Sequence, residues 1–135
     1  MPGKNSQPPP DADCPCGSGR PFSACCGPLL AGERTAETAE ALMRSRYTAH
    51  VLGNADYLRR TWHPATCPPE LTLADDVQWR RLRVLRVEAG GPADIEGVVA
   101  FEATFKQGGR AQRLREVSRF TRVGGRWLYI GAEVD

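Results

Sequence analysis

Four cysteines near the start of the chain carry the most specific chemistry in this sequence. Cys14, Cys16, Cys25 and Cys26 follow a C-x-C-x8-C-C pattern, whereas Cys67 stands apart and is interpreted as a bystander thiol. Thiolates are soft ligands, and four of them hold Zn²⁺ tetrahedrally with no open position for water or substrate. The pattern therefore predicts a closed, structural zinc site. A redox-active Cys25–Cys26 pair is the main alternative, and inert thiols are another.

The segment around these cysteines has little else to hold it together. Residues 13–28, DCPCGSGRPFSACCGP, contain only Phe22 as a large apolar side chain, which is too little for a hydrophobic core. Gly17-Ser18-Gly19 allows the chain to turn back, and Arg20 supplies positive charge beside a metal site that is negative overall. We expect loss of zinc to unfold this segment.

Composition describes an ordinary soluble protein of one domain. Hydrophobic residues make up 41% and charged residues 25% of 135 residues, and no apolar run is long enough to cross a bilayer, so no membrane contact is expected. The first thirteen residues lack the apolar region of a secretory signal. We therefore expect the chain to remain in the cytoplasm, a reducing compartment in which thiols persist. Residues 1–12 contain four prolines and are expected to form a disordered leader.

Helical spacing begins after the cysteine segment. Apolar or aromatic side chains recur every three or four residues, with Thr35 as the expected N-cap, Glu37 in the first turn and Gly53 as the stop. Asn54 is expected to cap a second, shorter helix, which Pro64 ends. The residues that define the first helix are Ala39, Leu42, Met43, Tyr47, His50 and Val51.

The C-terminal half of the sequence is predicted to form β-strands. Runs rich in β-branched and aromatic residues cover 78–88, 95–106, 112–123 and 126–131, and Gly124-Gly125 between the last two suits a two-residue type I′ hairpin. Helices followed by a meander of hairpins predict an α+β fold, an antiparallel sheet with helices across one face. In the third strand Arg119 alternates with Phe120, so the pattern leaves its inward face undecided.

These motifs resemble known families. CPCGSGRPFSACCGP resembles the SEC-C motif, a zinc module also found at the C-terminal end of the SecA translocation ATPase. Residues 41–64 and 117–130 are similar to the YchJ-like family of uncharacterised bacterial proteins. The resemblance implies a SEC-C-type motif over 13–30 and, over 31–135, a nuclear transport factor 2 (NTF2)-like cone, in which a curved antiparallel sheet wraps against helices. It brings no established activity.

A cone of this kind often encloses a pocket, and the sequence offers polar and aromatic side chains to line it. His63 is a candidate general base, with Glu102 or Glu116 as its carboxylate partner. The alternative interpretation is that these residues have structural roles, and that His50 is a half-buried histidine whose polar atoms have hydrogen-bond partners. The candidate pocket residues are Tyr47, Tyr57, Trp62, His63, Glu102, Glu116, Arg119 and Trp127.

Two functions therefore compete. The first is a cytoplasmic adaptor whose zinc segment contacts a protein or ribonucleoprotein, as the resemblance to the SecA module implies. The second is a small-molecule-binding or catalytic pocket in the cone, although no nucleophile motif or phosphate-binding loop predicts an enzyme. Dense arginines at 80–86 and 110–115 leave RNA contact open as a weaker idea, and cones of this fold often form homodimers through the sheet.

Overall fold

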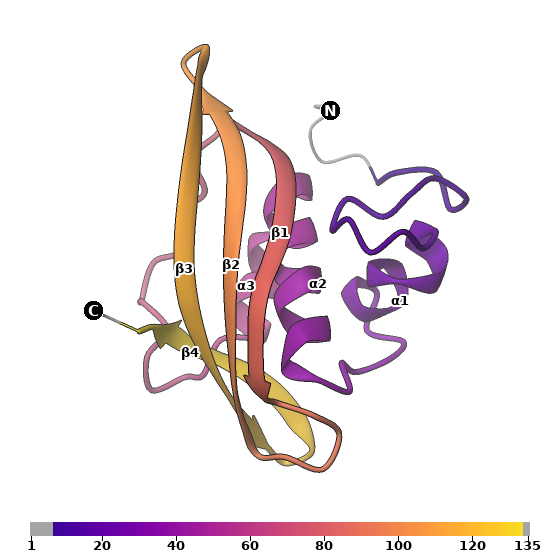
Figure 1. The fold of residues 1–135 in the computed structure, drawn as a ribbon, viewed down its shortest axis with the longest axis vertical. Helices are drawn as coiled ribbons and strands as arrows, with labels where there is room; N and C mark the ends of the chain where they lie inside the picture. The colour runs from indigo at the N-terminus through magenta and orange to yellow at the C-terminus, as the bar shows by residue number, and fades with distance from the viewer. Residues whose placement is uncertain (1–6, 134–135) are drawn as a thin grey trace.

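The computed structural model describes residues 7–133, and places a helix between a long curved sheet and the cysteine segment (Figure 1). The predicted leader and the predicted end of the cone therefore lie partly outside the described residues, at 1–6 and 134–135. The elements are the 3₁₀ helix η2 (Phe22–Ala24), α1 (Cys26–Leu30), α2 (Ala39–Leu52), α3 (Ala55–Arg60), β1 (Val77–Ala89), β2 (Glu96–Gln107), β3 (Arg110–Val123) and β4 (Arg126–Ala132).

The sheet is the antiparallel meander that the sequence predicts. Its four strands pair in the order β1-β2-β3-β4, and each predicted strand lies within two residues of the observed bounds. Gly124 and Gly125 join β3 to β4 with φ angles of 60° and 81°, as a type I′ turn requires. The predicted α+β architecture, with helices across one face of an antiparallel sheet, is confirmed.

The face of the sheet that turns toward α2 is defined by Phe120. Phe120 is 2% exposed, whereas its neighbour Arg119 is exposed on the opposite, outer face. Val99, Phe101 and Ala103 point inward from β2 and are also buried. Alternation along β3 thus resolves the ambiguity left by the sequence, and Arg119 does not face the interior.

The main helix starts later than predicted. Thr38, not Thr35, is the N-cap of α2, and its Oγ1 accepts a hydrogen bond of 3.0 Å from the Ala41 N–H. The predicted stop at Gly53 is correct, since Gly53 adopts the left-handed conformation with φ of 72°. Asn54 caps α3 as predicted, through its side-chain bond to the Tyr57 N–H.

The N-terminal end of α2 is fixed by contact with the sheet. The Ala39 N–H donates to the Gly90 carbonyl at 2.9 Å, just after β1. At Gly97, near the start of β2, an added Cβ would lie 2.6 Å from the Gly90 Cα and 3.0 Å from the Ala39 Cβ. Three backbone segments therefore meet where only glycine fits, which selects Thr38 over Thr35 as the cap.

Gly97→Ala should accordingly destabilise the protein by about 1–3 kcal/mol, because overpacking forces a backbone shift. Urea denaturation measures this loss of unfolding free energy. Gly131→Ala is the matched control, since an added Cβ at this other strand glycine meets no atom within 4 Å. Equal midpoints for the two variants would show that α2 does not depend on this contact.

The cysteine segment is tied into the fold upstream of the predicted boundary at residue 13. The Phe22 N–H donates to the Ala12 carbonyl at 2.8 Å, and the Ser23 N–H donates to the Pro10 carbonyl at 3.1 Å. Hydrogen-bonded structure therefore begins within the predicted leader. Among the described residues, no helix has the length and apolar character needed to span a membrane.

Candidate metal centre and adjoining cavity

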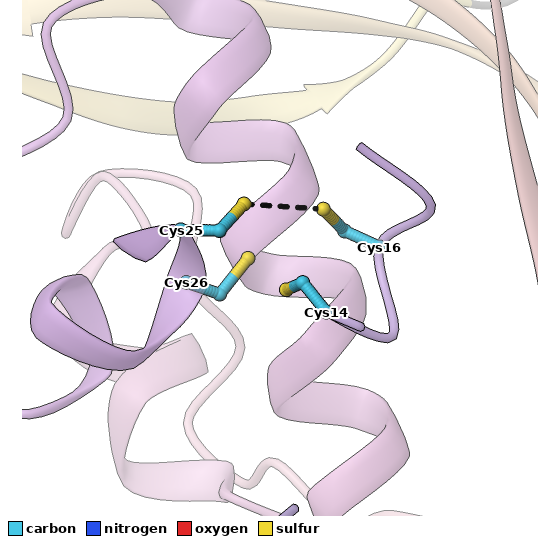
Figure 2. Close-up of side chains that lie close together, drawn as sticks. All are labelled: Cys14, Cys16, Cys25 and Cys26. Atoms are coloured by element: carbon cyan, nitrogen blue, oxygen red, sulfur yellow. Dashed lines mark hydrogen bonds between the residues drawn. The ribbon is translucent and has the colours of Figure 1, made fainter. Parts of the chain in front are cut away.

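Two short segments bring the four cysteines together (Figure 2). Cys14 and Cys16 lie on a loop that is closed by a hydrogen bond of 2.9 Å from the Cys14 N–H to the Arg20 carbonyl. Cys25 and Cys26 lie at the junction of η2 and α1, on the other side of the cluster. The loop and the helical junction thus supply two ligands each, as the paired spacing in the sequence predicts.

The sulfur positions fit a tetrahedral metal ion. All four Sγ atoms lie within 4.8 Å of one another, and those of Cys16 and Cys25 are 3.6 Å apart (Figure 2). Zn–S bonds of about 2.3 Å place the sulfurs of a tetrahedral site about 3.8 Å apart. No disulfide joins the cysteines of residues 7–133, so all four sulfurs remain available as ligands.

Helix α2 supplies part of the surroundings of the cluster. Thr48 Oγ1 lies 3.3 Å from the Cys26 Sγ, and Arg44 Nη1 donates to the Cys16 carbonyl at 2.8 Å. On the outer side, Ser18 Oγ lies 3.1 Å from the Cys25 Sγ. These contacts orient the cysteine side chains, as groups just outside a metal site usually do.

The thiols influence one another's ionisation. Hydrogen bonds from Cys14 and then Cys26 lower the pKa of the Cys16 thiol well below its usual range. The same network, with Cys14 as the largest contributor, raises the pKa of Cys26 far above its usual range. One thiolate is thus stabilised by its neighbours' S–H groups, whereas four thiolates this close together require a cation.

A cavity of about 310 Å³ lies on the other side of α2, between the helix and the inner face of the sheet. Three of the sequence-predicted pocket residues line it: Tyr47, Trp62 and Glu116. Glu116 Oε2 accepts hydrogen bonds from Ser118 Oγ at 2.6 Å and from the Tyr129 hydroxyl at 2.9 Å. The other lining residues are Met43, Arg46, His50, Leu71, Thr72, Leu73, Trp79, Phe101, Ala103, Leu114, Ser118, Phe120 and Tyr129.

The other predicted pocket residues lie elsewhere. Tyr57 is buried against Ser45, with its hydroxyl 2.7 Å from the Ser45 Oγ. Trp127 is buried at the end of the sheet, where its Nε1 donates to the Glu37 carbonyl at 3.2 Å. Both side chains line a separate, smaller cavity of about 160 Å³.

His63 and Glu102 do not form an acid–base pair. His63 Nδ1 accepts from the Ala65 N–H at 3.0 Å in the turn after α3. Glu102 lies on the outer face of the sheet, where Arg115 Nε donates to it at 3.1 Å and lowers its carboxyl pKa. Glu116 is held by Ser118 and Tyr129, so among the described residues His63 forms neither of the two predicted carboxylate pairs.

Arg46 is the cavity residue that sequence reasoning missed. It lies one position before Tyr47 in the periodic run of α2 and is only 7% exposed. Its guanidinium carbon lies 4.4 Å from the ring centroid of Tyr129 and 5.2 Å from that of Trp62. The hint in the sequence is that Arg46 follows Met43 by three residues and Leu42 by four, a spacing that also suits an exposed arginine on the helix surface.

His50 lines the same cavity and gives a testable pH dependence. Burial, and then the charge of Arg46, lower its pKa from 6.5 to about 4. Between these values the unfolded chain binds more protons than the folded one, so stability should fall as pH drops from about 6.5 to 4, by at most about 1.4 kcal/mol per pH unit. His50→Gln should flatten this part of the urea-denaturation profile. Parallel profiles for wild type and His50→Gln would contradict the assignment.

The fold and the cysteine cluster together define a class of protein, a SEC-C-type motif joined to an NTF2-like cone. The SEC-C motif matches residues 12–28, and the YchJ middle NTF2-like domain matches residues 38–132. The chain belongs to this YchJ-like family.

Relatives match along most of the chain. UPF0225 proteins from Deinococcus radiodurans and Chromobacterium violaceum are 50% and 52% identical, with 92% and 91% of this chain and 91% and 93% of those proteins covered. The solution structure of a SEC-C motif containing protein from Rhodopseudomonas palustris has a TM-score of 0.79 and 39% identity, and the match covers 92% of this chain and all of that one. A Psychrobacter arcticus crystal structure of another such protein has a TM-score of 0.74 at 25% identity, over 93% and 85% of the chains.

Proposed function

We propose that this chain is a zinc-binding protein in which Cys14, Cys16, Cys25 and Cys26 hold one structural Zn²⁺. The observation that carries the proposal is the approach of all four sulfurs to within 4.8 Å of one another. Four thiolates favour zinc over the harder Mg²⁺ or Ca²⁺, and they leave no coordination position for a substrate. The metal closes the cysteine segment and fixes it against α2.

The segment so fixed serves as an interaction module in the cytoplasm, and its partner is a protein or a ribonucleoprotein. Several of its residues are exposed although three of the four cysteines beside them are buried: Gly17, Gly19, Arg20, Pro21, Ser23 and Ala24. A metal-fixed loop presents such residues with little loss of conformational entropy on binding. Residues of this kind, held rigidly at the surface, support recognition rather than catalysis.

The test compares partners captured by three forms of the tagged, zinc-loaded protein. Cys25→Ser removes a half-exposed ligand, whereas Cys67→Ser removes a thiol outside the cluster. We expect Cys67→Ser to retain the wild-type partner set and Cys25→Ser to lose it. Identical partner sets for all three forms would remove the cysteine segment from the binding role, and native mass spectrometry of the same samples reads zinc content and subunit number.

A further inference from the structure

We propose that the cavity between α2 and the sheet binds a small organic monocarboxylate with an aromatic or branched apolar body, and that Arg46 receives its carboxylate. This site is separate from the four cysteines, and its argument does not depend on the metal. It rests on the charge and the free N–H groups of Arg46 and on the walls of the cavity.

Arg46 is a buried cation that no carboxylate among the described residues contacts directly. Its Nη1 donates to the Leu58 carbonyl at 2.8 Å and to Thr61 Oγ1 at 2.6 Å, and both acceptors are neutral. Within residues 7–133 no carboxylate forms an ion pair with it, and its Nε and Nη2 have no hydrogen-bond acceptor. A buried charge is costly unless it is paired, so the cavity offers a binding energy that an anion can recover.

The free edge of the guanidinium suits a carboxylate. Arg46 Nη1 is occupied by Leu58 and Thr61, which leaves Nε and Nη2 as two neighbouring N–H donors, the arrangement that binds both oxygens of a carboxylate. The Trp62 ring lines the cavity and stacks against Arg46, but its Nε1–H is enclosed by protein and is not a donor to a ligand.

The cavity favours a single negative charge. Glu116 lines it as well, and its carboxylate, held by Ser118 and Tyr129, offsets only part of the charge of Arg46 through space. A dianion such as a phosphate monoester would meet this carboxylate with no second cation to offset it, because Arg46 is the one Arg or Lys among the lining residues in the described chain. A monoanion leaves the smaller residual repulsion.

The walls set the shape and size of the rest of the ligand. Aromatic rings surround the cavity: Tyr47, Trp62, Trp79, Phe101, Phe120 and Tyr129. Its volume of about 310 Å³ lies at the lower end of the range of small-molecule sites, about 300–1,000 Å³. A planar or branched body of about ten to fifteen non-hydrogen atoms fits such a space.

The experiment titrates the zinc-loaded, full-length protein with indole-3-acetate and phenylacetate, and with their neutral amides, by calorimetry and ligand-observed NMR. Acid and amide share size and shape, so the difference between them reports the carboxylate contact. We expect the acids to bind about tenfold or more tightly than the amides, as a charge-assisted hydrogen bond predicts. Absence of acid binding at millimolar concentration, or equal affinities of acid and amide, would overturn the proposal.

Variants locate the contact. Arg46→Met should abolish the preference for acid over amide, whereas Arg119→Met, which removes an exposed arginine on the outer face of the sheet, should retain it. If Arg46→Met fails to fold, Ala103→Leu tests whether the ligand occupies the cavity. The larger leucine side chain enters the cavity and leaves Arg46 intact. Loss of binding in Ala103→Leu supports the cavity, and wild-type binding in that variant, or a retained acid preference in folded Arg46→Met, contradicts it.

Discussion

Replacing Cys26 with serine should release the metal and unfold the cysteine segment. Cys26 is 1% exposed, and its Sγ lies at the centre of the contacts among the cysteines and Thr48. A serine hydroxyl is a poor ligand for zinc at neutral pH. Zinc affinity should therefore fall by more than about 100-fold, the upper end of what loss of a second-layer partner alone costs.

Two measurements check this result. Metal analysis after dialysis against a weak chelator should find stoichiometric zinc in wild type and none in Cys26→Ser, and hydrogen exchange should show lost amide protection over residues 9–30. Cys67→Ser is the control, because its sulfur lies outside the cluster. Full zinc content in Cys26→Ser, or wild-type protection of the segment without metal, would contradict the assignment.

Truncation of Phe120 to alanine should give the largest loss of stability in the cone. Phe120 is 2% exposed, and its ring centroid lies 5.7 Å from that of Tyr129 across the cavity wall. Removing a buried phenyl ring costs both transfer free energy and the cavity that remains, about 3–5 kcal/mol. Thermal and urea denaturation should both report this loss.

Leu114→Ala is the matched control for Phe120→Ala. Leu114 lies on the same face of β3 and also lines the cavity, but it is 39% exposed. Its truncation removes fewer buried contacts and should cost about 1 kcal/mol or less. If the two variants lost similar stability, the inner face of β3 would not be the buried core that the structure describes.

The parts of this fold that the sequence predicts are those set by local chemistry. Paired cysteines, the Gly124-Gly125 turn and the Asn54 cap each need particular residue types at fixed spacing, and the structure places all of them as expected. The strands follow from β-rich runs between glycine turns. Local rules decide these features, so no knowledge of the tertiary structure is required.

The features that the sequence leaves open depend on distant contacts. Thr35 and Thr38 are both suitable caps, and only the meeting of Gly90, Gly97 and Ala39 selects the second. In the same way, the inward face of β3 is decided by the burial of Phe120 beside Tyr129 of β4, which places Arg119 outside.

Arg46 shows the same limit at the level of the site. As a charged residue on a helix it suggests a solvated side chain, yet α3 and β4 bury it between two aromatic rings. Its position next to Tyr47 does not distinguish a solvated arginine side chain from a buried one. Cavity residues of this kind emerge only from the packing of elements far apart in the chain.

Helix α2 connects the two candidate sites. Thr48 and Arg44 contact the cysteine segment, whereas Arg46, Tyr47 and His50 line the cavity. Figure 1 shows the helix between the sheet and the N-terminal segment, so each site uses a different side of one element. The cysteine segment thereby covers a face of α2 that the sheet leaves free.

Native mass spectrometry of protein purified without added chelator tests the central claim most directly. Our account predicts a folded chain that carries one zinc ion, and whose metal-free mass after denaturation corresponds to fully reduced cysteines. A metal-free folded chain, or a denatured mass that shows disulfides among Cys14, Cys16, Cys25 and Cys26, would contradict it.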